Sequence, residues 1–155
     1  MAQPGKGSRM AIDVGTVRIG VARCPSEQIM AVPVCTIQAG QSAIDEVSRL
    51  VQDHDIELIY VGNPISMKEK VTTSTLLAQD FATELANRVN IGVYLLDERL
   101  TTVSAQSQLK NSGKSSREGR SVIDQVAAVL LLDHALAIEK STGRLAGTLV
   151  SPTIK

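Results

Sequence analysis

Apolar and polar residues alternate along the first part of the chain. In the run from Arg9 to Ala22, apolar side chains recur at every second position on both sides of a Gly15-Thr16 pair. A period of two is typical of strands with one buried face, and the Gly-Thr pair supplies a turn, so we expect a β-hairpin. Two prolines bracket the loop that follows, and the run from Val32 to Ile37 predicts a third strand that continues the antiparallel pairing.

The pattern then changes to a helical period. Ser42 is a plausible helix N-cap, and residues 43–51 carry apolar side chains on one helical face. A second helix is predicted over residues 74–89, and short apolar strands are predicted over residues 58–61 and 93–96. Strands that alternate with helices are joined by crossovers, so these two strands should pair in parallel.

Two more helices complete the prediction. One begins at Thr101 or Thr102 and ends near Lys110, before an Asn-Ser-Gly stop, and the last spans residues 121–140 and is apolar on nearly all sides. The fold class is therefore α/β, with a mixed five-stranded sheet, its first three strands antiparallel and its last two parallel, and helices on both faces. We expect one domain over residues 9–140, a disordered tail over 1–8 and a C-terminal tail over 141–155.

Composition narrows the possible functions. Only three of the 155 residues are aromatic, so the core is aliphatic and no platform for stacking unpaired bases is evident. A formal net charge of zero excludes a uniformly basic surface but allows a local basic patch. Two cysteines are too few for a disulfide framework, and no apolar run is long enough to target or cross a membrane, so we expect a cytoplasmic protein with no membrane partner.

Three acidic residues stand in or beside apolar elements. Asp13 lies in the first strand, Glu98 lies in the Asp97-Glu98-Arg99 run that directly follows the strand at residues 93–96, and Asp124 lies in the last helix. A buried carboxylate is costly unless it is paired or binds a cation, so we expect the three to hold one or two Mg²⁺ or Mn²⁺ ions. Each also has a structural alternative: a turn-forming Asp13, an exposed ion-paired loop at Glu98, and an Asp124 favoured by the helix dipole.

A basic segment leads into the helix that carries Asp124. Lys114, Arg117 and Arg120 lie within it, and Arg18 lies in the hairpin. Cations beside an acidic metal site suit a phosphodiester substrate, so we predict that these four side chains contact nucleic-acid phosphates. The alternative for the segment is an ordinary solvated loop.

Four ordered motifs resemble one known family. They are AIDVGTVRIGVA, IYVGNP, LLDERLTTVSAQ and VIDQVAAVLLL, and together they extend over most of the chain. On these motifs the sequence resembles the YqgF family, whose members have a ribonuclease H-like fold and are described as nucleases of precursor 16S ribosomal RNA and, earlier, as Holliday junction resolvases.

The resemblance implies a function and a site. It implies catalysis by Asp13, Glu98 and Asp124 as metal ligands, on precursor ribosomal RNA and in association with the pre-ribosomal particle. The chain departs from the family pattern at Asn63, where an apolar residue is usual, and after Met67, where Lys-Glu-Lys replaces a glycine-containing loop.

Three other functions stay open from the sequence. A resolvase of branched DNA would act as a two-fold dimer, but no dimer-forming stripe stands out, so we expect a monomer or weak homodimer. A non-catalytic ribosomal-RNA-binding module could keep the same fold. A phosphotransferase of the actin and sugar-kinase type also begins with Asp-x-Gly-Thr, but it needs a second lobe that 155 residues do not accommodate.

Overall fold

A mixed sheet forms the centre of the molecule. The computed structural model describes residues 3–28, 30–63, 73–97 and 117–151, and its sheet has the strand order β3-β2-β1-β4-β5-β6. The elements are β1 (Arg9–Val14), β2 (Arg18–Cys24), β3 (Val32–Gln38), α1 (Ala43–Asp53), β4 (Leu58–Asn63), α2 (Thr73–Arg88), β5 (Gly92–Asp97), α4 (Arg117–Thr142) and β6 (Thr148–Leu149).

The pairing of the strands confirms the predicted mixed sheet. β1, β2 and β3 pair antiparallel, while β4 pairs in parallel with both β1 and β5. The sequence predicts five strands, but the structure has a sixth, because β6 pairs antiparallel with the end of the sheet at β5. β6 has only two residues, both exposed, and so has no alternating pattern that could predict it.

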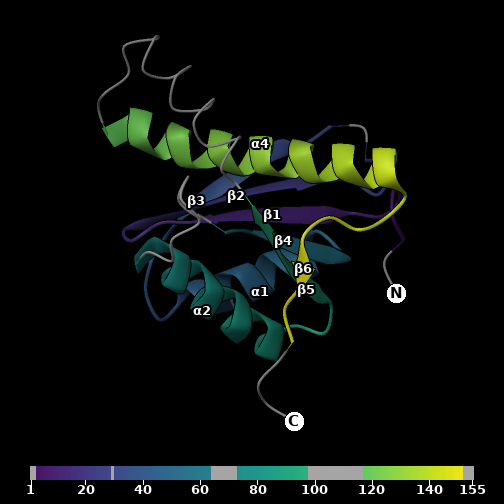
Figure 1. Ribbon diagram of the computed structural model, residues 1–155. Coiled ribbons are helices and arrows are strands. Elements are labelled where there is room, and N and C mark those ends of the chain that lie inside the picture. Colours follow the sequence, from purple (N-terminus) through teal and green to yellow (C-terminus); the bar gives the residue numbers. More distant parts are fainter. Residues whose placement is uncertain (1–2, 29, 64–72, 98–116, 152–155) are drawn as a thin grey trace.

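Helices cover both faces of the sheet (Figure 1), as predicted. α1 and α2 pack on one face, where Met10, Ile12 and Val61 belong to the buried core. α4 packs on the other face, where Ala11 and Tyr60 lie in a second core with Leu132. Successive residues of β1 thus belong to opposite cores, as the two-residue period requires.

Three predicted details of the helices have different outcomes. Ser42 precedes α1, but its side chain makes no capping hydrogen bond, because its backbone is already helical with φ −81° and ψ −8°. α4 begins at Arg117, four residues before the predicted start at Ser121. The helix predicted to begin at Thr101 or Thr102 lies outside the described residues.

The segment before β1 differs from the expected loose tail. From residue 3 to residue 8 the structure describes a β-bridge between Gln3 and Lys6 and a buried Ser8. The amide of Gly5 donates to Glu139 of α4 over 2.8 Å, so this segment packs on the domain.

Among the described residues, no helix is both long enough and apolar enough to cross a membrane.

Candidate functional site

Asp13 lies on the face of β1 that α4 covers. Ala11, two residues earlier, belongs to the core under α4, and residues two apart in a strand point to the same face. Asp13 is opposite Gly20 of β2 in the antiparallel register and is partly buried. Asp13 therefore faces the side of the sheet that is covered by α4, the helix that carries Asp124.

Gly20 lets α4 approach the sheet at this point. A Cβ atom at Gly20 would collide with the backbone carbonyl oxygen of Asp124, so only glycine allows this contact. Asp13 is the cross-strand partner of Gly20 and Asp124 touches it from above, so the two acids are neighbours of one residue on one face of the sheet. The structure thus brings together two of the three predicted metal ligands.

Asp124 forms an ion pair with Arg18 of β2. The Nε of Arg18 donates to Oδ2 of Asp124 over 2.9 Å, and the side chains keep 28% and 18% of their surface exposed. The neighbouring Gln125 donates from Nε2 to Oγ1 of Thr36 over 3.0 Å, which ties the same turn of α4 to β3. Arg18, predicted to contact phosphate, therefore lies beside the carboxylates.

The remaining predicted site residues lie wholly or partly outside the described residues. Glu98 follows Asp97, the last residue of β5, and is not described, and neither is Lys114. Arg117 and Arg120 belong to the first turn of α4, where the backbone alone is described. Within the described part of the chain, no three His, Cys, Asp or Glu side chains gather into a possible metal site.

The donor atoms at this place fit a hard divalent cation. Asp13 and Asp124 supply carboxylate oxygens, which Mg²⁺ and Mn²⁺ prefer, and the Asp124 carboxylate already binds a cationic side chain. Sequence reasoning found both acids but missed that Gly20 is the contact point and that Arg18 pairs with Asp124. The only sequence signal for either was the two-residue spacing of Arg18 and Gly20, which puts them on one face of a strand.

A second polar cluster lies far along α4, and the sequence analysis did not predict it. Glu139 is buried and accepts hydrogen bonds from Nε of Arg9 over 3.0 Å and from the hydroxyl of Tyr60 over 2.6 Å. Burial alone would raise the pKa of Glu139, but the hydrogen bonds from Arg9, Tyr60 and the Gly5 amide outweigh it and hold the pKa below its ordinary value. Burial and the bond to Glu139 raise the pKa of Tyr60.

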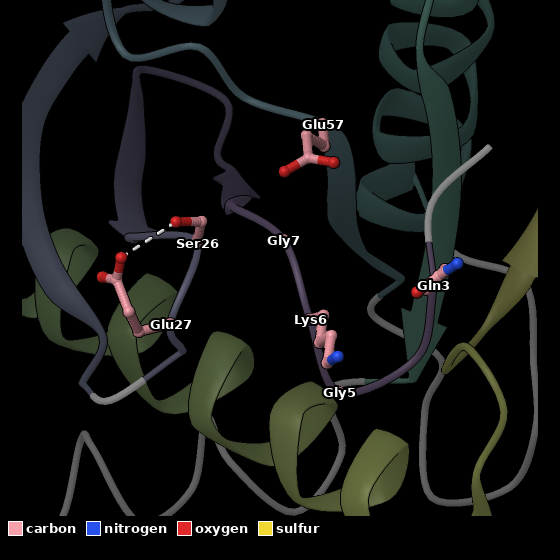
Figure 2. A pocket seen from close by; sticks show the side chains of 7 residues that line it. All are labelled: Gln3, Gly5, Lys6, Gly7, Ser26, Glu27 and Glu57. Carbon is pink, nitrogen blue, oxygen red and sulfur yellow. Dashed lines mark hydrogen bonds between the residues drawn. The ribbon is translucent and has the colours of Figure 1, made fainter.

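This cluster is distinct from the Asp13–Asp124 site. Glu139 lies fifteen positions after Asp124 in the helix, which corresponds to about 22 Å along the helix axis. A pocket of about 700 Å³ lies beside the N-terminal segment. Figure 2 shows the side chains that line it, with Glu57 on one side and a hydrogen-bonded Ser26–Glu27 pair on another. The side chains that line the pocket have mixed charge and include none of the predicted site residues: Gln3, Gly5, Lys6, Gly7, Ser26, Glu27 and Glu57.

Known proteins resemble this chain in sequence and in fold. The model of the family RuvX, described as a Holliday junction resolvase, matches residues 7–138. A protein of Clavibacter sepedonicus named "Putative pre-16S rRNA nuclease" is 44% identical over 93% of this chain and 91% of its own length. One of the same name from Leifsonia xyli is 42% identical over 96% of this chain and 97% of its own length.

Among solved structures, the RuvC protein of Thermus thermophilus, in complex with a Holliday junction substrate, has the same fold. It superimposes with a TM-score of 0.57 and 12% sequence identity, over 93% of this chain and 99% of its own. This likeness supports the ribonuclease H-like fold that the motifs implied. Since the family model spans most of the sequence and these two relatives are 44% and 42% identical over nearly its whole length, the chain belongs to the RuvX (YqgF) family.

Proposed function

We propose that this protein is a metal-dependent nuclease that hydrolyses phosphodiester bonds, and that it processes the 5′ end of precursor 16S ribosomal RNA in the cytoplasm. The observation that carries the proposal is the meeting of Asp13 and Asp124 at Gly20, on one face of a sheet, in a member of the RuvX family. The RNA substrate is taken from the names of the relatives.

Asp13, Asp124 and Glu98 are the proposed metal ligands. Glu98 is the third proposed ligand because it follows Asp97, the last residue of β5, in the sequence, and because the family motif Asp-Glu-Arg-Leu-Thr-Thr includes it. Bound Mg²⁺ or Mn²⁺ would lower the pKa of a water molecule and stabilise the leaving oxygen. The carboxylates would hold the metal, and the contact of α4 with β2 keeps Asp124 close to the sheet.

The basic side chains are the proposed phosphate contacts. Arg18 lies beside the carboxylates, and Lys114, Arg117 and Arg120 belong to or precede the start of the helix that carries Asp124. Cations there would hold the nucleic-acid backbone while the metal acts on one bond. We propose that the protein meets this substrate within a pre-ribosomal particle, as a monomer or a weak homodimer.

The test is cleavage of a 5′-extended 16S precursor by purified protein with Mg²⁺ or Mn²⁺. We expect Asp124→Asn to reduce kcat at least about a hundredfold, because a metal ligand is lost. Asp133→Asn is the matched control, since Asp133 is an exposed acid of the same helix, nine residues further on. The activity of this variant should equal that of wild type. Binding of the precursor by wild-type protein without metal-dependent cleavage would instead support a non-catalytic RNA-binding module.

A resolvase of branched DNA is the second candidate function. The description of the matching family model as a Holliday junction resolvase favours it. A four-way DNA junction and the ribosomal precursor should therefore be digested side by side at equal metal concentration. Faster cleavage of the junction, together with sedimentation as a two-fold dimer, would replace the RNA proposal by this one.

A further inference from the structure

The ion pair between Arg18 and Asp124 uses a group that a metal ion would need. Oδ2 of Asp124 accepts the Nε–H of Arg18 over 2.9 Å, at the place where α4 touches β2 opposite Asp13. Metal-bound carboxylates can still accept hydrogen bonds, but the metal draws electron density from the oxygen and so weakens its bond to a guanidinium. The two cations would also repel each other strongly, because they would lie only a few ångströms apart in a partly buried site.

Comparison with another arginine–carboxylate pair, Arg9–Glu139, shows how readily the Arg18–Asp124 pair can open. Arg9 and Glu139 are completely buried, and the Arg9 guanidinium donates from Nε and Nη2 to both oxygens of Glu139. Arg18 and Asp124 retain 28% and 18% exposure, and the described contact is a single one through Nε. A buried bidentate pair is a fixed part of the fold, whereas a solvent-accessible pair with one contact can open at low cost.

We propose that Arg18 is an exchangeable counter-ion of the metal site. It holds the Asp124 carboxylate in place while no metal is bound, gives up that carboxylate when a divalent cation binds, and then turns to a substrate phosphate. This inference rests on the proposed metal-dependent function, and it goes beyond it by giving one side chain two successive partners. Arg18 is thus a positioning residue for Asp124 before it is a contact for the substrate.

The first consequence is that Arg18 competes with the metal. We expect Arg18→Gln to bind Mn²⁺ about tenfold more tightly than wild type in calorimetric titrations without nucleic acid, because the competing charge is gone. Arg23→Gln is the matched control. This variant removes the same charge from the same strand, but Arg23 lies five residues further along β2 and, by the two-residue period, on the opposite face. The affinity of Arg23→Gln for Mn²⁺ should therefore change less than about twofold at physiological salt. Equal or weaker Mn²⁺ binding by Arg18→Gln would overturn the inference.

The second consequence can be observed without any activity. In ¹⁵N-labelled protein, the Nε–H signal of Arg18, assigned by its loss in Arg18→Gln, should shift and exchange faster with water as Mg²⁺ is added. The Nε–H signal of Arg9 is the internal control, since its buried bond to Glu139 should stay unchanged. An Arg18 signal that does not move at metal saturation would contradict the proposed exchange of partners.

The results also separate this inference from the proposed function. If Asp124→Asn abolishes Mn²⁺ binding while Arg18→Gln leaves it equal to wild type, the inference is wrong and the metal site stands. If wild-type protein binds neither Mn²⁺ nor Mg²⁺, both fail. At saturating metal, Arg18→Gln should raise the KM for precursor RNA several-fold, because the variant has no guanidinium to hold a substrate phosphate. An unchanged KM would contradict the proposed contact of Arg18 with the substrate.

Discussion

Asp124 and Glu139 are two carboxylates of one helix, each paired with an arginine, but their surroundings differ. Asp124 keeps partial contact with solvent and forms one described ion pair, with Arg18. Glu139 is buried and receives hydrogen bonds from three separate parts of the chain, through Arg9, Tyr60 and the Gly5 amide. The surroundings of Asp124 suit the metal-binding role that we propose for it, whereas those of Glu139 suit a structural role.

The Tyr60 hydroxyl provides a test of the structural role of Glu139. It donates to Glu139 over 2.6 Å and accepts from the Ala146 amide over 3.1 Å. Tyr60→Phe leaves both partners without this bond, so we expect the free energy of unfolding in urea to fall by about 2 kcal/mol. Tyr94→Phe is the control, since the two tyrosine rings pack against each other with centroids 6.0 Å apart. Equal losses in the two variants would contradict the role of the hydroxyl.

The lowered pKa of Glu139 predicts an effect of pH on stability. Because the folded protein holds the charged form more strongly than the unfolded chain does, this contribution is complete above the ordinary Glu pKa and is lost as pH falls through the folded value. Titration of the Glu139 side-chain carboxyl, followed by ¹³C NMR, should give a midpoint below that of an ordinary glutamate. A midpoint at or above the ordinary value would show that burial outweighs the hydrogen bonds.

At the scale of elements, the periodic segments could be predicted and the aperiodic ones could not. The hairpin, α1 and the parallel strands carry long enough apolar patterns to be recognised from the sequence. β6 has two residues and depends on the exposed edge of β5, so tertiary pairing alone defines it. The prediction was wrong about the start of α4 and about the Ser42 cap. Both errors concern helix ends, whose exact positions local sequence patterns define poorly.

The contact between α4 and β2 gives a prediction about two elements. Gly20→Ala would force the new methyl group against the Asp124 carbonyl oxygen, a backbone atom that cannot turn aside. We expect a loss of about 3 kcal/mol in the free energy of unfolding and weaker Mn²⁺ binding, because the helix must move away from the sheet. In Gly92→Ala, the control, the nearest atoms belong to the movable Tyr94 ring, so its loss should be smaller. A fully stable Gly20→Ala variant would disprove the close approach.

At the scale of the whole molecule, the acids of the site could be inferred from sequence, but their partners could not. Asp13 and Asp124 stand out because each interrupts an apolar element. The pairing of Arg18 with Asp124 joins residues 106 positions apart, and that of Arg9 with Glu139 joins residues 130 apart. Such contacts arise from how the elements pack, which no local pattern encodes.

The N-terminal segment provides a test at this scale. The Gly5 amide donates to Glu139, and the Gln3 carbonyl accepts from Nη2 of Arg9 over 2.7 Å, so residues 3–5 complete a buried ion pair. A variant that begins at Gly7 should lose about 2–4 kcal/mol of stability in urea, because two hydrogen bonds to buried charged groups disappear. A variant that lacks only residues 1 and 2 is the control. A loose tail, by contrast, could be removed without effect.

The most direct measurement for the whole account is the position of a bound Mn²⁺ ion in crystals, located by anomalous scattering. We predict one ion or two, with oxygen atoms of both Asp13 and Asp124 at about 2.1 Å from a shared ion, and no such ion in crystals of Asp124→Asn. Mn²⁺ bound by neither carboxylate, or by one of them at a site the other cannot reach, would contradict the claim that these two acids form one metal centre.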